Sequence, residues 1–506
     1  MEKTKKSVRL TLLGGVNEVG GNIILLEDFA YNTKIFLDFG IKIGKFYECY
    51  ERGQHPSCIE ELVDLNLIPN EENLSISNLY TREFKNAKTK VKAINKAQTN
   101  TKTELIDENY PSNLDGILIS HPHKDHYFGL SFVNRMIPIY TGVVTKRIIR
   151  AFCKSEKFTI VNNLNNLNWH TFRTGDILDI KGMKITPFHV DHSVPAAYGF
   201  IIYTSAGPVV YTGDFRRHGP LSNMTEEFLQ EIKAHSTVLA KCDPDKEQKD
   251  LISEGVKVLI CEGTKISKGI VESEQRVEEN LEKIFMNNPF DFILVKYDRI
   301  DWDRFRTFSH MAKKYGWKYI ITEKNAYFYY LLNKKAIHET MRDPNILKDD
   351  HIYILKRGSA NYKWQEKIRQ IMYRRNKGNR FLNYRELKSL EGKFLVYITR
   401  LHEGLKRNLD FAKRGLFISS SIDPYSEEFF DNTNTIRKQL EPYGIPSYRV
   451  HASGHATPHD IINFIEEVKP KYLIPIHTER PEFFRKLFQG SDIQVILPNK
   501  NQSIEF

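Results

Sequence analysis

Short runs of β-branched and aromatic residues recur through the first half of the chain, and each is closed by turn-forming residues such as Gly, Asp, Pro or Ser. Runs of this length bounded by such residues predict β-strands, and their close spacing favours stacked sheets over a helical bundle. The first half of the sequence therefore predicts a two-sheet domain. Its expected strands are "SVRLTLLGG", "NIILLED", "KIFLDFG", "GILIS", "PIYTG", "MKITPFHV", "GFIIYTS", "PVVYTGD" and "VKVLICEGT".

A different pattern begins near residue 272, where strand-like runs alternate with amphipathic helices. The stretch "DWDRFRTFSHMAKKYG" places Phe305, Phe308 and Ala312 on one helical face, between the strand-like runs "DFILVKYD" and "WKYIIT". This alternation is typical of βαβ units. We therefore predict a two-sheet domain in two parts, residues 1–271 and 440–506, with an α/β domain inserted between them at residues 272–439.

A polar, Asn/Lys-rich stretch near residues 47–110 interrupts the strand rhythm of the first part. We predict that it is an insertion that carries some helix and lies at the periphery of the domain.

Composition narrows the class of protein. A chain of 506 residues is long enough for more than one core, and its net charge of +11 points to a polyanionic partner such as nucleic acid. No apolar run reaches the ~18 residues that a membrane helix needs, so no membrane association is expected. The cysteines are scattered and never spaced as CxxC, which favours a reducing, cytoplasmic location. They are Cys49, Cys58, Cys153, Cys242 and Cys261.

The stretch "HPHKDH" follows the expected strand "GILIS" and brings His121, His123, Asp125 and His126 into one loop. Imidazole and carboxylate groups bind zinc and similar divalent ions. Four such groups within six residues could serve two ions, the first two groups holding one ion and the last two the other. The alternative is a surface loop that happens to be rich in histidine.

Further groups of the same kind stand at the ends of later expected strands. They are His189 and His192 in "FHVDHSVP", Asp214 in "VVYTGDF" and His477 in "YLIPIHTE". An aspartate in this position can bridge two cations, which lower the pKa of a shared water toward neutrality. Structural alternatives exist for single positions: Asp214 could cap a turn, and a lone histidine could be a hydrogen-bonded core residue.

Taken together, these motifs resemble the metallo-β-lactamase superfamily, and the inserted domain resembles that of the beta-CASP nucleases. The stretches "LLGGVNEVGGN", "LDFG", "DHSVP", "YTGDF", "VHASGHA" and "PIHTE" are similar to the ribonuclease J family. The match is dense in residues 9–40, 114–264 and 449–480, whereas the inserted region matches in layout only. The resemblance implies an α/β fold, an αββα metallo-β-lactamase sandwich with an inserted α/β beta-CASP domain.

The resemblance also implies a ligand set. His192 is preferred to His189 because it occupies the "HSxP" position of the family. The first ion is expected to be bound by His121, His123 and His192, the second by Asp125, His126 and His477, and Asp214 is expected to bridge them.

Two further residues match marks of the family. Glu262 in "CEGT" stands where an acidic residue supports the metal site, and His455 in "SGHA" stands where a histidine contacts the scissile phosphate. These two join Asp125 and Asp214 as the expected catalytic residues, and His451 is a second, weaker phosphate-binding candidate. The structural alternatives are a solvent-facing turn residue for Glu262 and a structural histidine for His455.

The residues after "SGHA" predict a helix with Thr457 as N-cap and Pro458 at the first helical position. The positive end of this helix would lie beside His455 and favour an anion there.

The resemblance implies two divalent ions, zinc with manganese as the alternative, that activate hydroxide to hydrolyse phosphodiester bonds. Its details favour RNA over DNA, cleaved as an endonuclease, a 5′–3′ exonuclease or both, by a homodimer or larger complex. The alternatives are a DNA nuclease of the Artemis type, a small-molecule hydrolase of the superfamily and an inactive metal-bearing scaffold. The basic stretch at 362–381 suits a polymer channel, although it could also be a solvated helix face.

Overall fold

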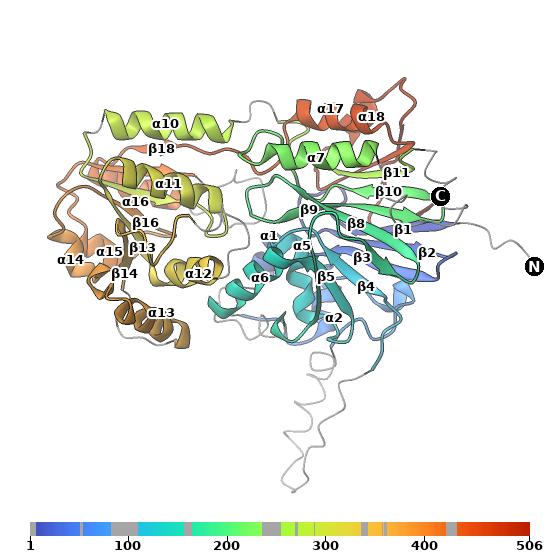
Figure 1. The fold of residues 1–506 in the computed structure, drawn as a ribbon, viewed down its shortest axis with the longest axis horizontal. Helices are drawn as coiled ribbons and strands as arrows, with labels where there is room; N and C mark the ends of the chain where they lie inside the picture. Colours follow the sequence, from blue (N-terminus) through green and yellow to red (C-terminus); the bar gives the residue numbers. More distant parts are fainter. Residues whose placement is uncertain are drawn as a thin grey trace, which may run out of the picture.

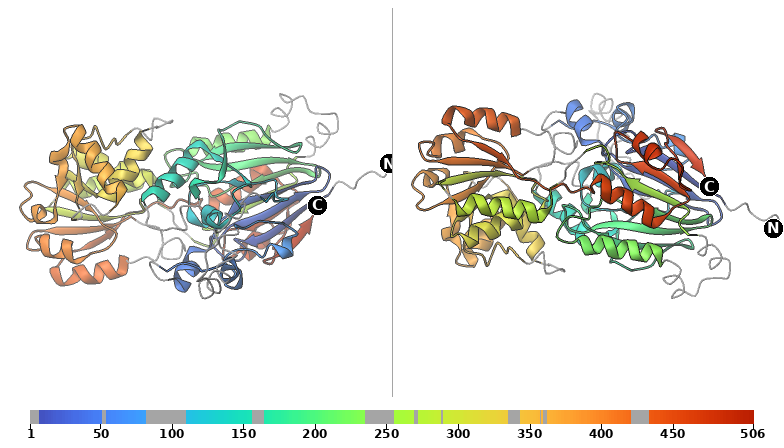
Figure 2. Two further views of the ribbon diagram at one scale, coloured as in Figure 1. Left: turned by 90° about the horizontal axis from the view of Figure 1, so that it is seen from below. Right: turned by 90° about the horizontal axis from the view of Figure 1, so that it is seen from above.

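The chain folds into two lobes that lie side by side in all three views (Figures 1 and 2). The computed structural model describes residues 7–50, 54–81, 110–155, 164–234, 255–268, 272–287, 289–334, 343–356, 358, 362–420 and 433–506. Within this part of the chain, no helix combines the length and the apolar character that crossing a bilayer requires.

The first lobe contains two seven-stranded sheets. In the first sheet the strands follow the order β21 (Gln502–Glu505), β1 (Val8–Gly14), β2 (Ile23–Asp28), β3 (Thr33–Phe39), β4 (Gly116–Ile119), β5 (Pro138–Gly142) and β6 (Asn168–Phe172). In the second sheet the order is β20 (Gln494–Val495), β19 (Tyr472–Ile476), β11 (Val258–Glu262), β10 (Gly207–Tyr211), β9 (Ala197–Thr204), β8 (Met183–Val190) and β7 (Leu178–Ile180).

The two sheets pack face to face through one apolar layer. Leu10 and Leu37 of the first sheet share this layer with Ile202 and Ile260 of the second, and all four side chains are fully buried. Helices cover the outer faces of both sheets. They are α1 (Ile43–Cys49), α2 (Ile59–Asp64), α5 (Lys124–Tyr127) and α6 (Val143–Ser155) on the first sheet and α7 (Ser222–Lys233), α17 (Pro458–Val468) and α18 (Glu482–Leu487) on the second (Figure 1).

The second lobe is built on a third seven-stranded sheet, whose paired strands all run parallel. The order is β15 (Phe381–Leu382), β14 (Ile352–Leu355), β13 (Lys318–Thr322), β16 (Phe394–Tyr397), β12 (Phe292–Lys296), β17 (Gly415–Ser419) and β18 (Ser447–Arg449). One face is covered by α10 (Glu274–Met286), α11 (Trp302–Lys314), α12 (Glu323–Asn333) and α13 (Lys363–Arg374), the other by α14 (Tyr384–Lys388), α15 (Glu403–Asn408) and α16 (Thr433–Leu440).

The sequence-based prediction of fold class is confirmed: an αββα sandwich carries an inserted α/β lobe. The inserted region does not extend either sheet of the sandwich. Because β18 pairs with β17, we propose that the chain returns to the first lobe near residue 450, about ten residues after the predicted boundary at 440.

The predicted insertion near residues 47–110 carries helix, as expected, in α2, but its predicted peripheral position is wrong for residues 54–81. In this segment Ile59, Leu62 and Leu79 are at most 4% exposed and belong to the core on the outer face of the first sheet. Their burial removes apolar area from water, which outweighs the polar average of the stretch. Residues 82–109 lie outside the described part of the chain.

The predicted start of the helix after "SGHA" is confirmed. Thr457 is the N-cap of α17, its hydroxyl accepts a hydrogen bond from the backbone N–H of Asp460 at 3.0 Å, and Pro458 is the first helical residue. The carboxylate of Asp460 accepts in turn from the backbone N–H of Thr457, which completes a capping box.

Gly40, at the end of β3, allows the chain to approach the "HPHKDH" loop closely. A Cβ at this position would lie 1.5 Å from the backbone oxygen of Asp125 and 2.7 Å from the backbone nitrogen of His126. Both contacts are with backbone, so the loop could make room only by moving.

We expect Gly40→Ala to lower the free energy of unfolding by about 2–3 kcal/mol, because overpacking against backbone is not relieved by a rotamer change. Thermal unfolding of the purified variant measures the effect. Gly404→Ala in α15 is the matched control, since the heavy atom nearest to a Cβ at Gly404 would be Nδ1 of His402, at 3.4 Å. An unfolding midpoint for Gly40→Ala equal to that of the control would contradict this description of the loop.

Candidate metal centre

The predicted ligand residues converge at one edge of the sandwich because they follow strands that end there. His121 stands two residues after the end of β4, and α5 carries Asp125 and His126. Strands β10, β11 and β19 are parallel neighbours, so their carboxyl ends lie together. Asp214 follows β10, Glu262 ends β11, and His477 follows β19.

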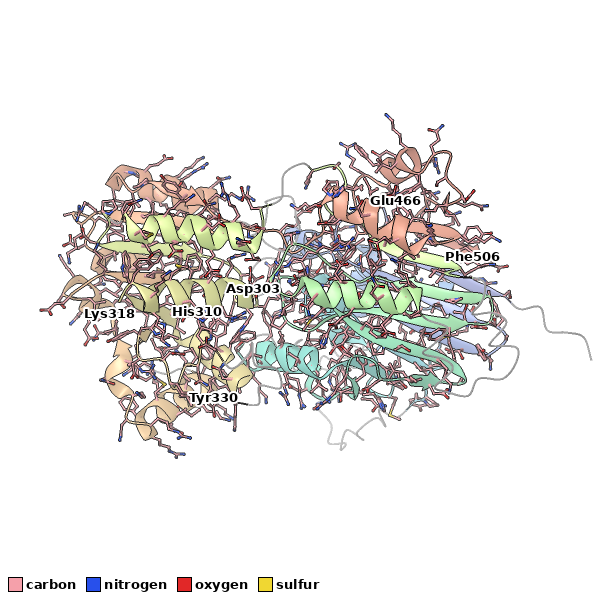
Figure 3. The ribbon with its side chains drawn as sticks, turned by 45° about the horizontal axis from the view of Figure 1, so that its top comes forward. Asp303, His310, Lys318, Tyr330, Glu466 and Phe506 are labelled. Atoms are coloured by element: carbon pink, nitrogen blue, oxygen red, sulfur yellow. The ribbon has the colours of Figure 1, made fainter. Side chains whose placement is uncertain are left out.

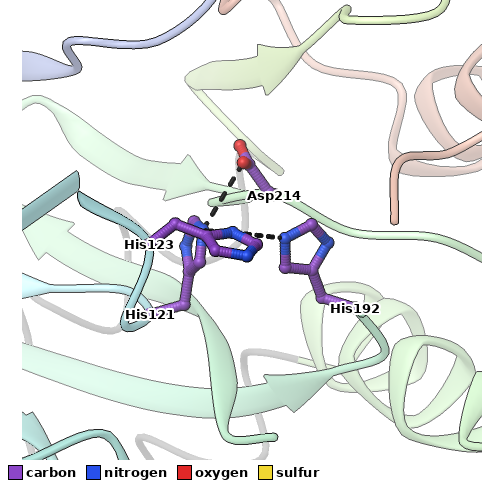
Figure 4. Close-up of side chains that lie close together, drawn as sticks. All are labelled: His121, His123, His192 and Asp214. Carbon is purple, nitrogen blue, oxygen red and sulfur yellow. Dashed lines mark hydrogen bonds and ion pairs between the residues drawn. The ribbon is translucent and has the colours of Figure 1, made fainter. Parts of the chain in front are cut away.

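Three imidazoles and one carboxylate form the first group of ligand atoms (Figure 4). Nδ1 of His123 lies 2.9 Å from Nε2 of His121 and 3.0 Å from Nε2 of His192. Oδ2 of Asp214 lies 3.5 Å from Nε2 of His121. A tetrahedral ion with bonds of about 2.0–2.1 Å holds neighbouring nitrogens about 3.3 Å apart, so these spacings are close to those of a zinc site.

A second group lies on the other side of Asp214 and consists of Asp125, His126 and His477. Nε2 of His477 is 3.1 Å from Oδ2 of Asp125, and Nε2 of His126 is 3.6 Å from the same oxygen. Oδ2 of Asp214 is 3.1 Å from Nε2 of His126 and 3.8 Å from Nε2 of His477. This one carboxylate therefore faces both groups.

The pKa values of the first group favour the neutral imidazoles that a metal requires. Burial, with a contribution from the nearby His126, holds the pKa of His121 well below its usual value. Burial likewise lowers the pKa of His123 to about 3 and, together with His123, lowers that of His192. Neutral imidazoles offer their nitrogen lone pairs to a cation without first losing a proton.

The carboxylates create a negative potential in the same place. Burial opposes the charge of Asp214, but His126 and His477 hold its pKa well below the usual value. Burial lowers the pKa of His126 and His477, but Asp214 and Asp125 outweigh it and raise the pKa of both histidines above its usual value. Such a potential attracts cations.

Each of four ligand imidazoles is oriented through its other ring nitrogen. The Nδ1 atoms of His121 and His126 lie 3.0 Å from Ser120 Oγ and 2.7 Å from Asp38 Oδ2, respectively. Nδ1 of His192 faces the backbone oxygen of Gly454 at 2.5 Å, and that of His477 lies 2.7 Å from Thr264 Oγ1. Partners of this kind fix ring orientation and raise ligand basicity in metal sites.

Asp38 is a residue of the site that the sequence analysis did not single out, although its "LDFG" motif was noted. It is fully buried and adopts a left-handed backbone conformation, with φ of 56°. Besides binding His126, it accepts hydrogen bonds from the backbone N–H and the hydroxyl of Ser120, both at 2.7 Å, and from the hydroxyl of Tyr211. An aspartate inside an otherwise apolar strand is the sequence signal for such a role.

Glu262 and His455 lie beside the two groups, and with Asp214 and His477 they form a third set of side chains that could hold an ion. Nδ1 of His455 is 3.1 Å from Oε1 of Glu262. The same carboxylate accepts hydrogen bonds from the backbone N–H groups of Phe215 and Thr264 and from the Thr264 hydroxyl at 2.7 Å. Thr264, also overlooked in the sequence, therefore connects Glu262 with His477.

Two predicted or alternative candidates lie outside the ligand groups. His189 faces Thr174 Oγ1 at 2.7 Å and stacks on Tyr198. For His451, burial and then the charge of Arg304 lower the pKa to about 3, and it is absent from the ligand groups of the described residues.

The basic stretch at 362–381 is partly engaged within the second lobe. Arg369 binds Glu323 at 2.6 Å, and the guanidinium of Arg380 donates to the backbone oxygens of Asp349 and Ile346. These two charges stabilise the lobe from within, so they belong neither to a solvated helix face nor to the lining of a polymer channel.

The residues present fit divalent metal ions. The buried Oδ1 of Asp214 accepts no hydrogen bond from the described residues, and the ligand set consists of imidazole and carboxylate groups. An orphaned carboxylate oxygen is costly in a protein interior unless a cation compensates it.

Comparison with known proteins agrees with this chemistry. Residues 96–247 match the beta-lactamase superfamily domain, and residues 448–498 match the Zn-dependent metallo-hydrolase RNA specificity domain. The first range contains the residues from His121 to Asp214, and the second contains His455 and His477.

Several relatives are similar over most of the chain. Ribonuclease J of Sinorhizobium meliloti is 22% identical over 72% of this chain and 58% of its own length, and that of Thermus thermophilus is 23% identical over 72% and 57%. Ribonuclease J2 of Bacillus subtilis is 22% identical over 94% and 70%. The chain thus spans less than two thirds of the length of the first two relatives.

A protein of unknown function from Enterococcus faecalis has the same fold, with a TM-score of 0.69 and 20% identity over 99% of this chain and all of the other. The matched domains and the buried groups of imidazoles and carboxylates point to the same superfamily. The chain belongs to the metallo-β-lactamase superfamily, in its beta-CASP form, and is a distant homologue of ribonuclease J.

We expect Thr264→Val to weaken zinc binding about tenfold or more, because His477 loses the hydroxyl that orients its ring. A competition titration against a chelating dye measures the dissociation constant. Thr141→Val is the matched control, since the Thr141 hydroxyl is equally buried but donates to the backbone oxygen of Ile119 in the neighbouring strand. Equal zinc affinity of the two variants would show that Thr264 does not support the site.

Proposed function

We propose that this protein is a metal-dependent nuclease that hydrolyses phosphodiester bonds of RNA, as an endonuclease, a 5′–3′ exonuclease or both. The observation that carries the proposal is the Asp214 carboxylate, which belongs to the first ligand group and lies 3.1 Å from Nε2 of His126 in the second, with His455 held beside it by Glu262. The match of residues 448–498 to an RNA specificity domain and the distant ribonuclease J relatives support RNA as the substrate.

In this proposal two divalent ions, zinc or manganese, occupy the two groups. His121, His123 and His192 hold one ion, Asp125, His126 and His477 hold the other, and Asp214 bridges them. When bound, such ions polarise the phosphate and lower the pKa of a water so that a nucleophile is available near neutral pH.

The side chains of the protein have distinct tasks in the reaction. The Glu262 carboxylate accepts a hydrogen bond from Nδ1–H of His455, which orients the ring. In the protonated imidazolium form, Nε2–H of His455 then donates to a phosphate oxygen or to the leaving oxygen. The N-terminus of α17 follows two residues later and adds positive potential beside this phosphate. Glu262 is thus a positioning residue, whereas His455 would contact the substrate.

We further propose a cytoplasmic location, which the thiols support. Among the described residues Cys49, Cys58, Cys153 and Cys261 are all free, and three of them are buried. Free thiols support a cytoplasmic location, where the environment is reducing.

We expect the purified protein with Mn²⁺ or Zn²⁺ to cleave end-labelled single-stranded RNA, and His455→Ala to cleave it on the order of 10²-fold more slowly while keeping its metal content. The product ladder on a denaturing gel distinguishes endonuclease from exonuclease cleavage and gives its direction. Binding of RNA should persist in the variant, because most affinity comes from contacts to the phosphate backbone.

His189→Ala is the matched control, since this histidine lies in the same stretch as His192 but binds Thr174. A His455→Ala variant as active as this control would exclude the phosphate role, and one that loses an ion would make His455 a ligand. Faster cleavage of DNA of equal length would favour the Artemis-type alternative, and turnover of thioesters or lactams without RNA cleavage would favour a small-molecule hydrolase.

We expect Asp214→Asn to bind about one ion per chain or fewer, where the wild type binds about two, because a neutral amide bridges two cations poorly. Elemental analysis of both proteins after gentle purification provides the measurement. Retention of the full metal content by Asp214→Asn would rule out the bridging role.

A further inference from the structure

The guanidinium of Arg216 is fully buried where the two lobes meet. Within the first lobe it donates to Oδ1 of Asp191 at 3.2 Å and to the backbone oxygen of Ser453 at 3.3 Å. Across the junction it donates to Oε1 of Glu274 at 2.9 Å and to Oδ2 of Asp303 at 2.6 Å. One cation therefore binds both lobes.

On the first-lobe side, both residues that the Arg216 guanidinium binds stand within two positions of a residue of the candidate metal centre. Arg216 itself stands two residues after Asp214, and its backbone N–H donates to the backbone oxygen of Asp191, the residue before His192, at 2.8 Å. Ser453, whose hydroxyl accepts from the backbone N–H of His455 at 3.1 Å, belongs to a third loop. The guanidinium thus ties three loops of the centre together.

On the second-lobe side, the partners stand at the beginnings of two helices. Glu274 is the first residue of α10, and Asp303 lies in the first turn of α11. Figure 3 shows Asp303 at the face of the second lobe that turns toward the first. Glu274 is shared with the buried Arg304, which binds both of its carboxylate oxygens.

Charge within this network is unevenly distributed. Burial raises the pKa of Asp303 to about 6 and that of Asp301, which faces Arg304, to about 8. The pKa of Glu274 is instead held below its usual value, since Arg304 and Arg216 outweigh the effect of burial. Glu274 is therefore a charged counter-ion that the two arginines share.

Gly219 has no side chain, which leaves room for the Arg216 guanidinium and the Asp191 carboxylate. A Cβ at that position would lie 2.2 Å from both Nε of Arg216 and Oδ2 of Asp191. A buried guanidinium that loses a partner leaves an uncompensated charge in the interior, which is strongly unfavourable. The loops of the centre and the second lobe should consequently hold fixed positions relative to each other.

We infer that Arg216 is a positioning residue through which the docked second lobe sets the spacing of the three loops, so that metal affinity depends on Glu274 and Asp303. The inference rests on the metal centre proposed above but not on the identity of its substrate. Neither carboxylate belongs to a ligand group, and the contact that both make toward the metal centre is the one with Arg216.

The test compares the zinc affinity of Glu274→Gln and Asp303→Asn with that of the wild type, in the full chain and without nucleic acid. Both changes keep side-chain size and remove the charge that Arg216 binds. We expect zinc dissociation constants 10- to 100-fold higher, the range found when partners of metal ligands are replaced. A chelating dye in competition reports the affinity, and thermal unfolding of the metal-free proteins reports the stability.

Two matched controls separate positioning from general stability. Glu323→Gln removes a buried carboxylate that binds Arg369 within the second lobe. Arg217→Lys changes the residue next to Arg216; the Arg217 side chain binds Glu226 at 2.6 Å in the first lobe. Both should bind zinc within about twofold of the wild type, since their partners lie away from the three loops.

Unchanged zinc affinity in Glu274→Gln and Asp303→Asn would overturn the inference, as would an equal loss in Glu323→Gln. Asp303→Asn leaves Glu274 in place and decides the question if Glu274→Gln does not fold. A wild type that binds no zinc or manganese would instead overturn the proposed metal centre, so the two failures are distinguishable.

Discussion

The structure depends on how it compensates carboxylates that are buried next to one another. Asp38, Asp125 and Asp214 are at most 2% exposed and lie around the same histidines. An ionised carboxylate in a protein interior is strongly unfavourable unless hydrogen bonds or cations compensate it. Here imidazoles supply part of that compensation. Divalent cations bound at the proposed ligand groups would supply the rest.

The sandwich brings distant segments to this point through its strand order. Residues between 121 and 477 meet because the ligand-bearing strands of both sheets end at the same edge of the lobe. The last candidate ligand, His477, comes from the segment after the second lobe, so the site is completed only when the chain has returned from that lobe. Arg216 connects the site with the second lobe. It stands in the loop of Asp214, binds the loop of His455 through Ser453, and binds two helices of the second lobe.

Much of this could be predicted from the sequence because the signals are local. Each expected strand of the first half is present, and the ligand-type residues stand at strand ends, where the pattern changes from apolar to polar. Thr457 and Pro458 predicted the start of a helix, because capping depends on residues within a single turn. The short polar edge strands β6 and β21 were not predicted, because their pairing with β5 and β1 is decided by neighbours far away in sequence.

The partners of the site were harder to predict for the same reason. Asp38 reads as one polar residue in an apolar strand, and only tertiary structure brings it to His126, 88 residues away. Likewise, nothing around Thr264 or Arg216 indicates which groups they bind. The polar composition of residues 54–81 concealed the regularly placed apolar side chains that enter the core.

Anomalous X-ray diffraction from crystals grown with zinc tests the central claim most directly, because it locates each ion among its ligands. The account predicts two peaks about 3.5–4 Å apart, as in two-metal hydrolytic sites, with Asp214 between them. One peak should be surrounded by His121, His123 and His192 and the other by Asp125, His126 and His477. A single peak, or two peaks that do not share Asp214, would contradict it.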